Sequence, residues 1–182
     1  MADYTDDEII NFCKNKETLD KGYRILVKKY SSRTYWHIRR IVIDHDDAND
    51  VTQDVFIKVW KNLEDFRADC TLFSWIYRIA TNESLNFIRR SKKKLFIPLE
   101  STENYLSNQL HQSDFISGDE IVMKLQKAIV KLPDRQRIVF NMRYYDDLSY
   151  NEISEILKIT TGSLKASYHH AVKKIELLLE KD

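Results

Sequence analysis

Acidic and amide side chains crowd one stretch of the chain, residues 46–60. Asp50 and Asp54 stand one helical turn apart, with Gln53 beside them. Like charges at that spacing cost a few tenths of a kcal/mol in an isolated helix. The pattern favours a surface that docks on a basic partner, and the alternative is an ordinary solvated face.

Catalytic chemistry is not indicated by any group of acids, histidines or cysteines. Asp46, Asp47 and Asp50 could gather Mg²⁺, but one helix seldom supplies a complete site. Cys13 and Cys70 are isolated, so idle thiols are expected rather than a zinc site or a disulfide. No glycine-rich phosphate loop occurs. The sequence therefore predicts a protein that is not an enzyme and holds no metal or cofactor.

A second polar set lies near the C-terminus, where residues 149–174 have helix-turn-helix form. Ser149 caps a short helix, and Glu152 completes a capping box. Residues 158–162 make a tight turn in which Gly162 can take a positive φ. The second helix of such modules enters the DNA major groove, whereas the alternative is an ordinary helical hairpin. Its exposed face is expected to carry Thr161, Ser163, Lys165, Ala166, Ser167 and His170, with Lys173 and Lys174 placed for phosphates.

Composition points to an all-α fold. The 182 residues are 43% hydrophobic and 31% charged, which is typical of a globular chain. Three Gly and two Pro are too few for many tight hairpins. No apolar run approaches the ~20 residues of a membrane span. Residues 1–8 lack a signal peptide's basic start and apolar centre, so a cytoplasmic protein is expected.

Helical periodicity predicts the elements that position these side chains. Helices are expected at residues 6–19, 21–43, 46–61, 72–90, 120–132, 134–144, 149–157 and 163–179. The acidic helix has a core stripe of Ala48, Val51, Val55, Val59 and Leu63. Phe56 and Trp60 form a second apolar pair off that stripe, and Asp46 or Asp47 can cap the helix.

Two segments lack the helical pattern. Residues 62–71 are polar and indicate a loop. Residues 97–118 are dense in Ser, Thr, Asn and Gln and indicate a flexible linker, with a transient helical turn as the most structure expected there. The chain is therefore predicted to form two small helical domains, residues 1–96 and 119–182.

Four segments resemble signature motifs of the bacterial extracytoplasmic-function (ECF) sigma factors, in the family's order. They are DANDVTQDVF at 47–56, FR at 66–67 leading to WIYRIATN at 75–82, LPDRQR at 132–137 and GSLKASYHHA at 162–171. Each motif alone is moderate evidence, whereas four in order are strong evidence.

The resemblance implies one protein partner and two DNA elements. The family's acidic helix binds the clamp helices of the largest RNA polymerase subunit, which here implies Asp50, Gln53, Asp54 and Phe56. The loop and the helix after it would capture the opened −10 strand through Phe66, Arg67, Asn82, Asn86, Arg89 and Arg90. The helix-turn-helix would read the −35 duplex through Thr161, Ser163, Lys165, Ser167, His170, Lys173 and Lys174. Trp75 and Tyr77 are candidates for base stacking, although core packing is favoured for Trp75.

The chain departs from the family pattern in its second DNA-reading helix. Ala166-Ser167 stands where the family often has Ser-Arg, and His170 stands where a second arginine is usual. The −35 sequence therefore does not carry over. No sensory extension is recognised after Leu178, so a separate anti-sigma factor is the expected regulator.

Two other functional classes fit parts of the chain. A helix-turn-helix regulator acting without polymerase would explain residues 149–174 but would give residues 46–86 no task. A nucleic-acid enzyme would require a metal or nucleophile site, for which the spacing gives no support.

Overall fold

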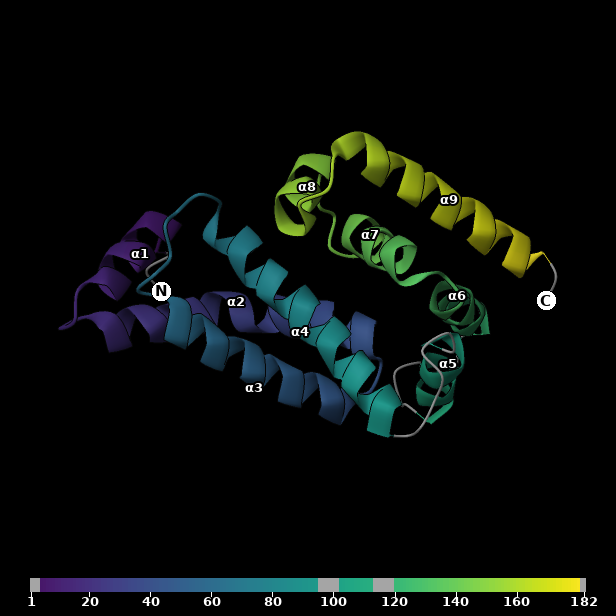
Figure 1. The fold of residues 1–182 in the computed structure, drawn as a ribbon, viewed down its shortest axis with the longest axis horizontal. Coiled ribbons are helices and arrows are strands. Elements are labelled where there is room, and N and C mark those ends of the chain that lie inside the picture. The colour runs from purple at the N-terminus through teal and green to yellow at the C-terminus, as the bar shows by residue number, and fades with distance from the viewer. Residues whose placement is uncertain (1–3, 95–101, 113–119, 181–182) are drawn as a thin grey trace.

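The computed structural model describes residues 4–94, 102–112 and 120–180, and every regular element in those residues is an α-helix. Figure 1 shows two groups of helices side by side. The first group contains α1 (Asp6–Lys14), α2 (Leu19–Val42), α3 (His45–Asn62) and α4 (Leu72–Lys94). The second contains α6 (Glu120–Val130), α7 (Asp134–Tyr144), α8 (Tyr150–Leu157) and α9 (Thr161–Leu179), and α5 (Thr102–Gln112) lies between the groups. None of the described helices is long and apolar enough to cross a membrane.

The helix starts follow from short polar side chains. Ser149 and Glu152 form the predicted capping box at α8, in which the Ser149 hydroxyl accepts from the Glu152 amide. At α3 the cap is Asp44, whose Oδ1 accepts from the amides of Asp46 and Asp47 at 2.9 and 3.0 Å. The prediction that Asp46 or Asp47 caps this helix is wrong because the chain is already helical from His45.

The turn of the helix-turn-helix differs from its predicted form. Lys158 takes the left-handed conformation, with φ 57°, and its amide donates to the Ser154 carbonyl. Gly162 lies inside α9 instead, because Thr160 caps that helix and accepts from the Ser163 amide. Helix α9 thus begins two residues earlier than expected, and its first turn carries Thr161 and Ser163.

The acidic helix packs through its predicted stripe. Ala48, Val51, Val55 and Val59 are buried in a hydrophobic cluster with residues of α2 and α4. Side chains at steps of three and four lie on one face of a helix, so burying that face leaves the opposite face to solvent.

The predicted linker contains a packed helix. Tyr105, Leu106 and Leu110 of α5 are buried in the same hydrophobic cluster as the first helical group. The prediction of at most a transient turn was wrong here, because three apolar residues among polar ones are enough to form one narrow stripe. The rest of the predicted linker lies outside the described residues.

The two groups of helices share an interface. Tyr77 of α4 is fully buried in a cluster whose other fully enclosed members come from the second group, including Val139 and Ile153. His37 and Arg40 of α2 contact Asp146, which follows α7. The two groups therefore pack against each other in this structure.

Candidate nucleic-acid interface

The acidic face of α3 is exposed as predicted. Asp50, Gln53 and Asp54 all lie on the solvent side of the helix. Burial and the nearby charges of Asp44, Asp50 and Asp46 raise the pKa of Asp47 above its ordinary value. Among the described residues, neither Asp50 nor Asp54 has an ion-pair partner. The face therefore carries uncompensated negative charge.

Phe56 does not belong to that exposed face. Its side chain is 7% exposed and lies in the core, and its carbonyl accepts from the Tyr23 hydroxyl at 2.8 Å. Its predicted partner Trp60 is 37% exposed and packs edge-on against the Tyr23 ring. Sequence reasoning missed Ile57, which is 50% exposed and one turn beyond Gln53. Ile57 follows Gln53 by four residues and Asp54 by three, and this helical spacing could have placed it on the same face.

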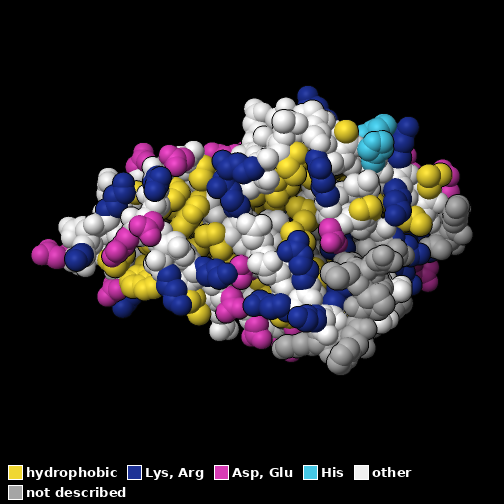
Figure 2. All heavy atoms as spheres, viewed as in Figure 1, with side chains coloured by type: hydrophobic (Ala, Val, Ile, Leu, Met, Phe, Trp, Pro, Cys, Tyr) yellow, Lys and Arg dark blue, Asp and Glu magenta, His cyan; other side chains and the backbone are white. Residues whose placement is uncertain are grey.

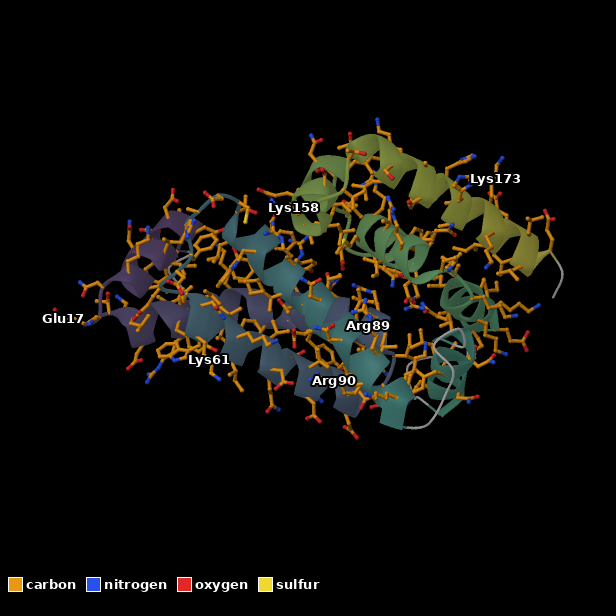
Figure 3. All side chains as sticks on the ribbon, viewed as in Figure 1. Glu17, Lys61, Arg89, Arg90, Lys158 and Lys173 are labelled. Carbon is orange, nitrogen blue, oxygen red and sulfur yellow. The ribbon has the colours of Figure 1, made fainter. Side chains whose placement is uncertain are left out.

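The structure brings the four predicted side chains of α4 onto one surface. Asn82, Asn86, Arg89 and Arg90 are all exposed, and the Arg89 guanidinium donates to the Asn86 side-chain oxygen at 3.1 Å. Figure 3 shows Arg89 and Arg90 projecting from the C-terminal half of this helix. Amides that can hydrogen-bond base edges are thus followed by cations that suit phosphates.

Sequence reasoning missed Arg78, which lies one turn before Asn82. Its guanidinium is half-buried and donates to the carbonyls of Glu155 and Ile156, at 2.8 and 3.1 Å. Arg78 therefore lies on the same side of α4 as Asn82, but its guanidinium contacts α8.

The loop before α4 exposes only part of its predicted site. Arg67 is exposed, whereas Phe66 is 7% exposed and its ring lies 4.9 Å from that of Trp75. Phe66 anchors the loop instead of presenting its ring to a base. Trp75 is half-buried against the core, and Tyr77 is fully buried against the second helical group in this structure.

Helix α9 presents a polar, basic face. Lys165, His170 and Lys173 are exposed, whereas Leu164, Ala171 and Ile175 are buried. The remaining predicted residues Thr161, Ser163, Ser167 and Lys174 are half-buried.

Two of those half-buried side chains are already engaged within the protein. The Ser163 hydroxyl accepts from the Arg135 guanidinium. The Lys174 ammonium donates to the Lys131 carbonyl at 2.8 Å, so this lysine ties α9 to the turn after α6. Figure 2 shows Lys and Arg side chains spread over the visible face of both helical groups.

The described residues contain no cluster of three or more His, Cys, Asp or Glu side chains that could hold a metal ion. Cys13 is buried and free, and burial raises the pKa of its thiol to about 11. A thiol in that state is a weak nucleophile at neutral pH. The described surfaces offer three kinds of contact: an acidic face on α3, an amide and cation face on α4, and a basic face on α9.

Two family models match the chain. Sigma-70 region 2 matches residues 26–94, and Sigma-70 region 4 matches residues 123–175. The first segment holds the acidic face of α3 and the amide and cation face of α4, and the second holds the helix-turn-helix.

Curated relatives agree with these models. The chain is 32% identical to the ECF RNA polymerase sigma factor SigW of Bacillus subtilis over 152 residues, which cover 79% of this chain and 81% of SigW. It is 27% identical over 164 residues to the ECF RNA polymerase sigma-E factor of Haemophilus influenzae, covering 86% of each chain.

Two solved structures share the fold. One is the sigma factor RpoE in complex with the anti-sigma factor NepR from Bartonella quintana, with a TM-score of 0.66, 19% identity, and coverage of 89% of this chain and 99% of RpoE. The other is CnrH in complex with the cytosolic domain of CnrY, with a TM-score of 0.70, 19% identity, and coverage of 97% and 98%. From the two region models and the identity to SigW, the chain belongs to the extracytoplasmic-function family of sigma-70 RNA polymerase sigma factors, which bind core polymerase and direct promoter-specific transcription initiation.

Proposed function

We propose that three separate faces of this chain carry out the three binding tasks of a sigma factor. The acidic face of α3, formed by Asp50, Gln53 and Asp54, docks on basic clamp helices of the core polymerase. The exposed face of α4 holds the opened −10 strand. The exposed face of α9 reads the −35 duplex. The proposed domains are residues 1–96 and 119–182, with residues 97–118 joining them.

The α4 face carries this proposal, because its four exposed polar side chains follow one another at helical spacing. Taking a base out of the duplex stack costs a few kcal/mol. A surface that binds only the opened strand shifts that equilibrium without catalysing any step. Asn82 and Asn86 offer hydrogen bonds to exposed base edges, and Arg89 and Arg90 offer charge to the backbone.

The α9 face suits intact duplex. Lys165 is exposed near the start of the helix, the part that meets base edges in helix-turn-helix modules. Lys173 lies two turns later and suits a phosphate. Lys174 is proposed as a lesser contributor, because its ammonium is bound to the Lys131 carbonyl.

The proposed partner on α3 includes an apolar component. Ile57 and Trp60 are exposed one turn or more beyond the acidic residues, so a docking helix can bury them beside its ion pairs. Phe56 supports this surface from the core and does not touch the partner.

A separate anti-sigma factor is the proposed regulator, and the cytoplasm is the proposed location. Two proteins of this fold, RpoE and CnrH, were solved in complex with NepR and CnrY respectively. The similar fold of this chain supports, by analogy, regulation by a separate protein that binds it.

The test is transcription in vitro from fragmented genomic DNA by bacterial core polymerase, with and without the purified chain. Mapped start sites that depend on the chain should share two sequence elements, one upstream near −35 and one near −10. If the chain retards duplex DNA but adds no start site to those of core polymerase, it acts as a helix-turn-helix regulator without polymerase.

A further inference from the structure

Helix α8 lies on the N-terminal part of the strand-binding face of α4. At about 100° per residue, Thr71, Arg78, Asn82 and Arg89 fall within an arc of roughly 40°. Arg78 donates to the carbonyls of Glu155 and Ile156, which lie in the last turn of α8. Those carbonyls have no partner within their own helix, so the guanidinium caps α8 from the other domain.

Glu155 makes the reverse contact at the start of α4. Its carboxylate accepts from the Ser74 hydroxyl and from the Thr71 amide, the latter at 3.4 Å. Thr71 ends the loop that carries the exposed Arg67. The first helix of the helix-turn-helix is thus seated where the opened strand would pass between that loop and Asn82.

A buried carboxylate also holds the two helical groups together, through contacts with α2. Asp146 is 8% exposed, and its oxygens lie 2.6 Å from Arg40 Nη1 and 3.0 Å from His37 Nδ1. Arg33 also donates to the Asp146 carbonyl at 3.1 Å. All the side-chain partners of Asp146 in the described residues come from α2, in the other domain. Removing this carboxylate would leave buried polar groups of α2 unpaired.

The closed arrangement cannot engage both promoter elements. Elements centred about 25 base pairs apart lie roughly 85 Å apart at 3.4 Å per base pair. A compact chain of this length has a radius of gyration of only about 16 Å. Because α8 contacts α4 directly, the two DNA-reading faces must separate before one chain can span that distance.

We propose that the Asp146 contacts hold the free chain in this closed form, in which α8 occupies the N-terminal end of the strand-binding face at Thr71 and Arg78 and leaves the exposed residues from Asn82 onward uncovered. In the open form Arg78 exchanges the α8 carbonyls for a phosphate of the −10 strand. This inference rests on the proposed strand-binding role of α4. It predicts that only the open fraction competes for core polymerase and promoter, so the apparent Kd rises as that fraction falls.

The test compares Asp146→Asn with Asp147→Asn in the full chain. Asp147 is the neighbouring residue, but its side chain is 95% exposed, and its ion-pair partner among the residues that the structure describes is Arg143 of its own domain. Small-angle X-ray scattering should show a larger radius of gyration for Asp146→Asn and no change for Asp147→Asn. With core polymerase and a −10/−35 promoter, Asp146→Asn should reach half-maximal transcription at about tenfold lower concentration. Its maximal rate should equal that of wild type.

Arg78→Ala tests the exchange itself. It should also expand the chain, but it should bind a single-stranded −10 oligonucleotide more weakly than Asp146→Asn does. Equal scattering profiles for wild type, Asp146→Asn and Arg78→Ala contradict the proposal that the Asp146 contacts hold the chain in the closed form. If Asp146→Asn is expanded but reaches half-maximal transcription at the wild-type concentration, the closed form does not inhibit the chain. A wild-type chain that supports no transcription contradicts the proposed function instead, while the scattering still decides whether Asp146 holds the domains together.

Discussion

Reversing both charges of the α3 face, in the double variant Asp50→Lys with Asp54→Lys, should abolish stable core-polymerase binding without unfolding the helix. Both side chains are exposed and lie beyond the first turn of α3. The new pair repeats the like-charge spacing of the old one. A lysine at position 50 also gains an attraction to Asp46 and Asp47 in the preceding turn, worth about 0.2–0.5 kcal/mol each. The free energy of unfolding should therefore stay within roughly 1 kcal/mol of wild type.

The effect on docking is larger. An exposed ion pair contributes about 0.2–1 kcal/mol, and a like-charge contact at an interface costs several kcal/mol. Two reversals should therefore weaken binding by about 3–4 kcal/mol, which is a 10²–10³-fold rise in Kd. The loss should shrink as salt rises, because exposed charges are screened over about 8–10 Å at moderate ionic strength.

Fluorescence anisotropy with labelled chain and core polymerase, without DNA, measures this Kd. A matched control is Glu17→Lys with Asp20→Lys, which makes the same change in net charge at the turn between α1 and α2 and in the first turn of α2. Figure 3 shows Glu17 at the far end of the bundle. If the Asp50 and Asp54 variant keeps a wild-type Kd, or if the control loses as much affinity, the acidic face is not the docking surface.

Two predictions concern stability, each measured by thermal unfolding. Ser149→Ala removes the α8 cap and should cost about 1 kcal/mol at pH 7. Hydrogen bonds from the Ser149 side chain and backbone lower the pKa of Glu152. The stability that these bonds contribute is therefore present above the unfolded pKa of Glu152 and is lost as pH falls through its folded pKa. The gap between Ser149→Ala and wild type should narrow in acid, and a constant gap contradicts this account. Burial and three neighbouring aspartates raise the pKa of Asp47, so its ionised form opposes folding. Asp47→Asn should therefore melt above wild type at pH 7 and lose that advantage below the ordinary carboxyl range. Equal melting temperatures for Asp47→Asn and wild type at pH 7 would show that ionised Asp47 does not oppose folding.

Local patterns were sufficient to predict most of the helices. The capping box at Ser149 and the stripe through Val51, Val55 and Val59 depend on residues a few positions apart, and both are present in the structure. The exposed faces followed from the same periodicity, because a buried stripe determines the solvent side of its helix. This is why the acids of α3 are exposed as predicted, whereas the polar side chains of α4 were assigned from the family resemblance and are also exposed.

Contacts between distant segments were beyond that reasoning. Phe56 and Phe66 were assigned to interfaces by motif, but each fills a space that other helices create. The α5 stripe becomes stable only when it packs against the first helical group. The pairing of His37 with Asp146 joins residues more than a hundred positions apart, and no spacing in the sequence predicts it.

The division of labour between α4 and α9 is the central claim, and a pre-opened promoter tests it most directly. Asn82→Ala with Asn86→Ala should leave binding to closed duplex nearly unchanged and slow formation of the open complex. Both residues are exposed, and alanine is the better helix former, so the fold should tolerate the change. Losing two hydrogen bonds of about 0.5–1.5 kcal/mol each predicts a 5- to 150-fold slower step. Lys165→Ala should instead weaken duplex binding, with a lost base contact costing about 1–3 kcal/mol.

The measurement is the rate at which transcription-competent complexes form, followed by abortive RNA synthesis, on two templates that differ only in a mismatch bubble at the −10 element. The bubble removes the unstacking cost in advance, so it should restore most of the activity of the Asn82 and Asn86 variant. It should give Lys165→Ala little benefit, because that side chain is proposed to act on the −35 duplex. Equal rescue of both variants, or rescue of neither, would contradict the assignment of strand capture to α4 and duplex reading to α9.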